Sequence, residues 1–253
     1  MNREIASALK EFVAAVDSLL DNKIVAAYCF GSAAYHDFRL GYSDLDFFIV
    51  VDAALSQGNF QAFHELRAEY RRGDNPYLAV LEGEIVPYSA IINGGRRGNT
   101  IYWGTTKDRF NREYGLRGFS MCGLLEAGYL IQGRDIRGEI PYPSREEMLA
   151  QVASLVGTIR KHAVKTDRDI HSADWLFLIS QSLYWLKTGR TTGKTLAAQW
   201  VLTNCRYPWQ GLLEKAVELR LCPALARQES WQLWLEQLGA GIQQACSSLE
   251  AEL

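Results

Sequence analysis

Two aspartates separated by one residue carry the strongest chemical signal in this chain. Asp44 and Asp46 stand at the head of a long apolar run, and side chains two residues apart on a strand point to the same face. Carboxylates crowded in this way repel each other, and a hard divalent cation is the usual remedy. Because Mg²⁺ binds through one or two carboxylates together with substrate phosphates, the pattern predicts a Mg²⁺ site at Asp44 and Asp46.

A glycine and two serines accompany these acids. Gly31-Ser32 ends an apolar run over residues 24–30, and Ser43 directly precedes the first aspartate. Glycine lets the backbone come close to a ligand, and the amides that begin a short helix at residues 32–35 would face a phosphate. Together these features predict a site that transfers part of a nucleoside triphosphate.

A third acid is needed as a base, because nucleotidyl transfer removes a proton from the acceptor hydroxyl. Glu82 and Glu84 share one face of a predicted strand by the period of two. A carboxylate in an apolar strand is costly unless it has a partner. Glu82 is the preferred base and Glu84 its rival, while an edge strand with a solvated polar face is the structural alternative.

Composition limits the class of protein. The 253 residues suffice for one large domain or two modest ones, and 48% hydrophobic with 22% charged residues is typical of a globular protein. The net charge of −2 offers no basic field for a nucleic-acid backbone. A nucleic acid is therefore an unlikely partner, which disfavours a polymerase.

The cysteines and the N-terminus indicate where the protein works. Five scattered cysteines include no CxxC pair, so neither zinc nor a disulfide framework is expected. The chain shows no signal peptide and no apolar run of membrane length. We expect a soluble cytoplasmic protein without a membrane partner.

Hydrophobic periodicity places the acids in an α/β (α+β) N-terminal domain with a mixed sheet. It predicts a helix over 3–20, strands over 24–30 and 45–51 and a helix over 60–70. It also predicts a strand region over 79–92 with an interruption near Pro87, a turn over 93–99 and a strand over 100–103. A further helix is expected from about residue 116 to 133.

After a proline-rich connector at 141–143, the pattern is helical throughout. Ser144 and Glu147 form a plausible capping box, and helices are predicted over 145–162, 170–188, 194–204, 208–221 and 229–250. The predicted architecture is a nucleotidyltransferase domain over 1–143 followed by an all-α helical bundle over 144–253.

Gly31-Ser32 followed by Ser43-Asp44-Leu45-Asp46 resembles the signature of the polymerase-β-like nucleotidyltransferase superfamily. The helical half resembles, more narrowly, the streptomycin/spectinomycin (aminoglycoside) adenylyltransferases. The matching motifs there are Ile179-Ser180-Gln181, Tyr184-Trp185, Thr188-Gly189-Arg190, Lys194 and Ala197-Ala198-Gln199-Trp200.

The resemblance implies an adenylyltransferase that moves AMP from ATP to a hydroxyl of a small cationic acceptor, most simply an aminoglycoside antibiotic. It implies Mg²⁺ as cofactor and ATP as co-substrate. The roles that it implies are metal binding for Asp44 and Asp46, catalysis for Glu82, nucleotide binding for Gly31, Ser32, Ser43 and Lys194, and drug binding for Asp167 and His171.

Three positions depart from the family pattern. Gln181 stands where the family has a phosphate-binding arginine, Leu116 where an acid follows the third strand region, and His171 where the drug pocket has an acid. Asp167, Asp169 and Asp174 could equally be acids at a helix N-terminus. Two other functions therefore stay open: adenylylation of a protein hydroxyl, as in toxin–antitoxin systems, and weak nucleotide binding without catalysis.

Overall fold

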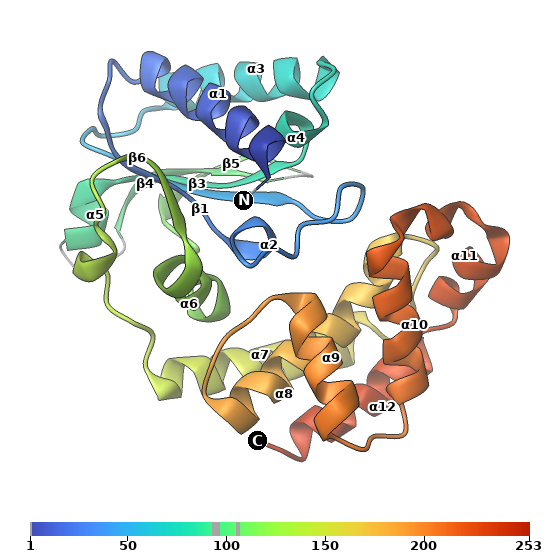
Figure 1. Cartoon of the computed structure of the whole chain (residues 1–253). Helices are drawn as coiled ribbons and strands as arrows, with labels where there is room; N and C mark the ends of the chain where they lie inside the picture. The colour runs from blue at the N-terminus through green and yellow to red at the C-terminus, as the bar shows by residue number, and fades with distance from the viewer. Residues whose placement is uncertain (1, 93–96, 105–106) are drawn as a thin grey trace. The chain divides into compact units, whose positions relative to one another are not determined.

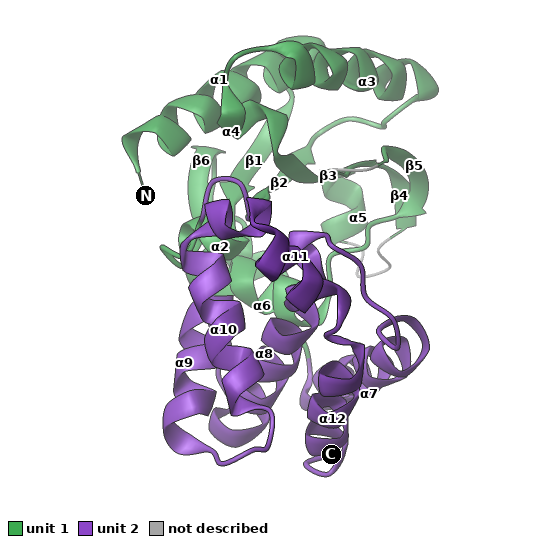
Figure 2. Ribbon diagram, turned by 90° about the vertical axis from the view of Figure 1, so that its right-hand side faces the viewer, with its two compact units in different colours: residues 1–38, 43–143 green, residues 39–42, 144–253 purple. Residues whose placement is uncertain are grey.

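The computed structural model, which describes residues 2–92, 97–104 and 107–253, separates into two units (Figure 2). The sheet unit comprises Met1–Phe38 and Ser43–Pro143, and the helical unit comprises Arg39–Tyr42 and Ser144–Leu253. The chain passes from one unit to the other between Pro143 and Ser144. The short segment Arg39–Tyr42, which the sequence places in the first domain, instead packs with the helices.

The sheet unit is built on six strands in the order β5-β4-β3-β2-β1-β6. The central strands β2 and β3 run parallel, and every other neighbouring pair is antiparallel. The strands are β1 (Ile24–Cys29), β2 (Leu45–Val51), β3 (Leu81–Pro87), β4 (Arg97–Trp103), β5 (Arg109–Glu113) and β6 (Tyr129–Gly133). The predicted mixed sheet is thereby confirmed.

Helices cover both faces of this sheet (Figure 1). They are α1 (Arg3–Leu19), α2 (Gly31–Ala34), α3 (Gln57–Arg72), α4 (Pro76–Ala79), α5 (Tyr88–Ile92) and α6 (Gly118–Ala127). On the face of α1 and α3, Phe12 packs against Phe47 and Trp103, with ring centroids 4.6 and 5.3 Å apart. On the opposite face, Phe48 packs with residues of α6. Because side chains alternate along β2, successive residues pack into two separate hydrophobic cores, one on each face of the sheet.

Two predicted elements are wrong at their ends. The helix expected to reach residue 133 stops at Ala127, and Tyr129–Gly133 forms β6, paired with β1. The strand region expected over 79–92 is interrupted at Pro87 as predicted, but the residues after it form the helix α5 and not a strand. Residues 129–133 form a strand because they pair with β1, which is distant in sequence, and such pairing cannot be recognised from hydrophobic periodicity. Of the predicted turn over 93–99, residues 93–96 lie outside the described residues, and residues 97–99 belong to β4.

The helical unit contains α7 (Arg145–His162), α8 (Asp174–Thr188), α9 (Lys194–Asn204), α10 (Gln210–Leu221), α11 (Glu229–Glu236) and α12 (Gly239–Glu250). The capping box of α7 is present, with Glu147 N donating to Ser144 Oγ at 3.2 Å and Ser144 N donating to Glu147 Oε2 at 2.8 Å. The single helix predicted over 229–250 is two helices. A Cβ atom on Gly239 would collide with the carbonyl of Val164, so the backbone approaches closely at this break.

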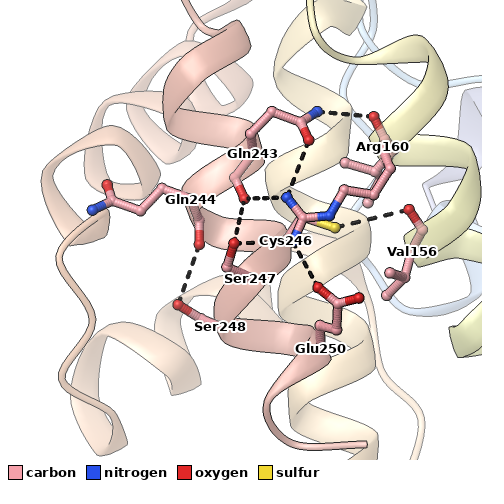
Figure 3. A network of polar contacts seen from close by, with 9 residues as sticks. Val156, Arg160, Gln243, Gln244, Cys246, Ser247, Ser248 and Glu250 are labelled. Atoms are coloured by element: carbon pink, nitrogen blue, oxygen red, sulfur yellow. Dashed lines mark hydrogen bonds and ion pairs between the residues drawn. The ribbon is translucent and has the colours of Figure 1, made fainter.

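Polar contacts join the first and last helices of this unit (Figure 3). Arg160 of α7 donates to Gln243 at 3.2 Å, to Ser247 Oγ at 3.0 Å and to Glu250 Oε2 at 2.6 Å, all on α12. Gln243 Nε2 returns a bond to the carbonyl of Ile159 at 2.9 Å. None of the helices in the described ranges combines the length and apolarity needed to cross a membrane.

Candidate active site

The two parallel strands bring the predicted metal ligands and the predicted base together. Asp46 of β2 lies directly opposite Glu82 of β3 in the strand register. Neighbouring strands lie about 4.8 Å apart, so the two carboxylates project side by side from one face. Asp44 precedes Asp46 by two residues and points to the same face. Three acids, each partly buried, therefore meet at the start of these strands.

Gly31 and Ser32 lie beside these acids. Gly31 has φ +62°, and a Cβ atom there would collide with the carboxylate of Asp46, so only glycine fits. Phe30 N donates to the carbonyl of Asp46 at 3.1 Å, and Ser32 Oγ donates to the carbonyl of Asp44 at 3.4 Å. The end of β1 is thus fastened to the start of β2, which places the short helix α2 next to the acids.

This donor set fits Mg²⁺. Among the described residues, no group of three or more His, Cys, Asp and Glu side chains is arranged to hold a metal ion. Mg²⁺ does not require such a group, because it usually keeps several waters and binds through one or two carboxylates plus substrate phosphates. Gly31 has no Cβ atom, and this leaves free the space beside the Asp46 carboxylate that a side chain would fill. A partly open metal site needs such space for waters and phosphates. Asp44 and Asp46 are the residues that would hold the ion.

The structure separates the two glutamates that share the face of β3. Glu84 is 5% exposed and accepts hydrogen bonds from the backbone N–H groups of Gly115, at 2.7 Å, and Leu116, at 2.9 Å. Its carboxylate therefore holds the segment before α6. Leu116, at the position of a family acid, takes part through its backbone. Glu82 lies one step closer to the aspartates, directly opposite Asp46, as the predicted role of a base requires.

Tyr102 is a residue of this site that the sequence analysis missed. Its hydroxyl donates to Glu82 Oε1. Burial raises the pKa of Tyr102, and the carboxylates of Glu82 and Asp44 raise that pKa further, so the hydroxyl keeps its proton at neutral pH. The effect of Asp44 on Tyr102 shows that both acids lie within electrostatic reach of one ring. Only the β4 register, which local patterns do not reveal, brings Tyr102 here.

Within the helical unit, Lys194 and His171 both contact Asp174. Lys194 Nζ donates to Asp174 Oδ1 at 2.9 Å, and His171 Nδ1 lies 3.0 Å from Asp174 Oδ2. Burial opposes the charge of Asp174, but Lys194 and His171 outweigh it and hold the pKa of this carboxyl below its usual range. By its sequence, Asp174 is a candidate helix-terminal acid, and no local pattern reveals its central place in this cluster.

Tyr42 joins the same cluster from the segment Arg39–Tyr42. Its hydroxyl donates to Asp174 Oδ1 at 3.0 Å, and its ring contacts His171 and Phe177. The guanidinium of Arg220, only 1% exposed, lies 4.8 Å from the centre of the Tyr42 ring. These contacts explain why the segment packs with the helices. Neither Tyr42 nor Arg220 was predicted, since no local pattern pairs residues so far apart.

The remaining predicted residues have local partners. Asp167 accepts from Ser172 Oγ at 2.8 Å and from Asp169 N at 3.0 Å, and the Ser172 bond lowers the pKa of Asp167. Gln181, at the position of a family arginine, donates to the carbonyl of Thr192 at 2.7 Å. Ser43 is buried beside Asp44 in the sheet unit. Gly31, Ser32, Ser43, Asp44, Asp46 and Glu82 thus lie in the sheet unit, and Asp167, His171 and Lys194 lie in the helical unit.

Comparison with known proteins agrees with this geometry. Residues 9–97, which carry the glycine, both aspartates and Glu82, match the family model described as a nucleotidyltransferase domain. The chain therefore carries the domain of an enzyme that transfers nucleotides. No curated protein matches the sequence.

A solved structure extends the likeness to the helical unit. The spectinomycin adenyltransferase AAD(9) from Enterococcus faecialis, solved with ATP and spectinomycin, is 14% identical, with a TM-score of 0.70 over 96% of this chain and 98% of that one. At this identity the match shows the fold. The chain thus carries a nucleotidyltransferase domain over residues 9–97 and shares the fold of the spectinomycin adenyltransferase, in agreement with the family resemblance seen in its sequence motifs.

Proposed function

We propose that this enzyme transfers AMP from ATP to a hydroxyl group of a small cationic acceptor of the aminoglycoside type, with Mg²⁺ as cofactor. The observation that carries the proposal is the placing of Asp46 directly opposite Glu82, with Gly31 packed against the Asp46 carboxylate. The proposed metal-binding acids, the proposed base and a backbone suited to phosphate then lie together at the start of the two central strands. Three acids so arranged serve transfer chemistry better than nucleotide binding alone.

Each residue has a defined task in this reaction. Glu82 takes the proton from the acceptor hydroxyl, and the oxygen attacks the α-phosphorus of ATP while the bond to the leaving pyrophosphate breaks. Gly31, Ser32 and Ser43 bind the triphosphate through the amides and hydroxyls at the end of β1 and the start of β2. Mg²⁺ bound by Asp44 and Asp46 would stabilise the charge that develops on the phosphates.

Three residues of the helical unit also have proposed roles: Lys194, Asp167 and His171. Lys194 is a compact cation already held by Asp174, and in the proposal it binds the phosphates of ATP. Asp167 and His171 lie four residues apart around the turn that leads into α8, where an acid favours a cationic acceptor. The neighbour with a similar fold was solved with ATP and spectinomycin, which supports ATP and a small acceptor as the substrates proposed here.

A role in antibiotic resistance and a cytoplasmic location follow from the same proposal. ATP is available in the cytoplasm, and drugs that act on intracellular targets meet a modifying enzyme there. Each of the five cysteines is a free thiol, which suits a reducing compartment.

The decisive experiment measures pyrophosphate release from MgATP with a panel of aminoglycosides, including streptomycin and spectinomycin, and with the Glu82→Gln variant as the blank. We expect release that depends on one class of acceptor and is lost in the variant. ATP labelled in the α-phosphate then shows where the label goes. Label on a protein would favour protein adenylylation, and MgATP binding without transfer to any acceptor would favour a nucleotide-binding module.

A further inference from the structure

The position of Tyr102 in the sheet gives it a contact with the proposed base. In the register of β3 and β4, Tyr102 lies opposite Glu84, yet its hydroxyl reaches the diagonal neighbour and donates to Glu82 Oε1. Diagonal neighbours in an antiparallel pair are within reach of an aromatic side chain. Backbone amides thus donate to Glu84, whereas a phenol donates to Glu82, which also lies within electrostatic reach of Arg67.

The ring of Tyr102 is itself held in place. A Cβ atom on Gly104 would collide with Cε1 of the ring, so the backbone of residue 104 packs directly on it. Arg109 is the cross-strand neighbour of Tyr102 on β5, and its guanidinium carbon lies over the Tyr102 ring, 5.4 Å from the ring centre. A ring fixed by packing and by a cation–π contact presents its hydroxyl in one place.

We propose that Tyr102 is a positioning residue for the proposed general base, holding Glu82 Oε1 so that Oε2 is aimed at the acceptor hydroxyl. This inference rests on the transferase function proposed above. A glutamate has a broad terminal torsion, and a base must lie within about 2.6–3.2 Å of the proton that it removes. Tyr102 restrains that torsion and does not itself exchange a proton in the step.

The size of the effect follows from geometry. A misplacement of about 1 Å in a catalytic group costs on the order of a hundredfold in rate, whereas loss of general-base catalysis costs about 10²- to 10⁴-fold. Removing only the hydroxyl of Tyr102 leaves Glu82 present but less restrained. We therefore expect Tyr102→Phe to lower kcat by about tenfold to a hundredfold, with the Kd of MgATP unchanged.

The chain offers a matched control. Tyr77 also donates its hydroxyl to a glutamate, Glu4, at 2.7 Å, but Glu4 belongs to the first turn of α1 and lies outside the catalytic group. The experiment compares wild type, Tyr102→Phe, Tyr77→Phe, Glu82→Gln and the double variant Glu82→Gln/Tyr102→Phe. It measures acceptor-dependent pyrophosphate release, MgATP binding by calorimetry, and Tm. The ¹³Cζ NMR signal of Tyr102, assigned by its loss in Tyr102→Phe, is followed in Glu82→Gln.

The expected result has three parts. Tyr102→Phe loses kcat at unchanged Kd and Tm, Tyr77→Phe behaves as wild type, and adding Tyr102→Phe to Glu82→Gln costs nothing more. A Tyr102→Phe variant that turns over at the wild-type rate would overturn the inference while leaving the transferase intact, as would a Tyr102 signal that ignores Glu82→Gln. Wild type without release for any acceptor would instead remove the proposed function, and the role of Tyr102 with it.

Discussion

Two clusters of charged side chains in this molecule differ in their ratio of acidic to basic groups. In the sheet unit, Asp44, Asp46 and Glu82 crowd acids of one sign onto neighbouring positions of two strands, and Glu82 receives a hydrogen bond from the neutral hydroxyl of Tyr102. In the helical unit, the single acid Asp174 is surrounded by Lys194, His171 and Tyr42.

The difference separates acids proposed to bind a metal ion from an acid that positions the proposed ligand-binding residues Lys194 and His171. Crowded acids repel each other, and a cation with its phosphates relieves that repulsion. An acid that already has an ammonium partner stabilises the unit in which it lies. Charge alone would not distinguish the two clusters. The proportion of acids does: three acids meet at the start of β2 and β3, where Arg67 lies within electrostatic reach of Glu82, whereas in the helical unit one acid contacts two basic side chains.

The largest expected effect is at the acids proposed to bind the metal. Asp46→Asn should lower kcat by about a thousandfold, because a bound metal contributes several kcal/mol and each ~1.4 kcal/mol is a factor of ten. Stability should not fall, since the substitution relieves crowding. Asp52→Asn, just beyond the other end of β2 and exposed, is the control. Pyrophosphate release and thermal unfolding measure the two effects, and wild-type turnover by Asp46→Asn would disprove the metal assignment.

Next in size is the contrast between the two glutamates of β3. Glu82→Gln should reduce kcat by about 10²- to 10⁴-fold, the usual share of a general base, and leave urea unfolding unchanged. Glu84→Gln should lower the free energy of unfolding by about 1–3 kcal/mol, because an amide cannot accept both backbone N–H bonds that the carboxylate accepts. Reversed outcomes, with activity lost at Glu84 and stability lost at Glu82, would exchange their roles.

Substitution of Asp174 should lower the free energy of unfolding by an amount that depends on pH. Asp174→Asn leaves Lys194 without its ion pair and should cost about 1.5–3 kcal/mol at pH 7, the range for hydrogen bonds to charged groups. The lowered pKa of Asp174 means that its contribution is full above the ordinary aspartate pKa of about 3.9 and declines as pH falls below it. Urea unfolding of both proteins at pH 7 and at pH 3 measures this, and a difference that does not shrink would contradict the pairing.

The smallest effect should come from the exposed network between α7 and α12. Glu250→Gln removes the partner of Arg160, but their side chains are 55% and 37% exposed. Water already solvates both groups, so the loss in unfolding free energy should be below about 1 kcal/mol. Thermal unfolding at low and high salt tests this, and a large or salt-insensitive loss would show that the network is more than a surface contact.

Much of this protein was accessible from its sequence. The spacing of Asp44 and Asp46, the glycine before them and Glu82 on the next strand predicted a site that the parallel register brings together. The helices over 145–162 and 194–204 agree with α7 and α9 to the residue. These features succeed because strand alternation, helical periodicity and capping are local rules, readable within a few turns or residues.

Tertiary structure decided what local rules do not reach. Only strand order could make Tyr129–Gly133 a partner of β1 and bring Tyr102 to Glu82. Only packing could take Arg39–Tyr42 out of the first domain and place Tyr42 on Asp174. The sequence by itself predicted which acids are candidates for chemistry, because that prediction depends only on residue type and spacing. Long-range contacts determined what holds each acid, because partners distant in sequence meet only in the folded chain.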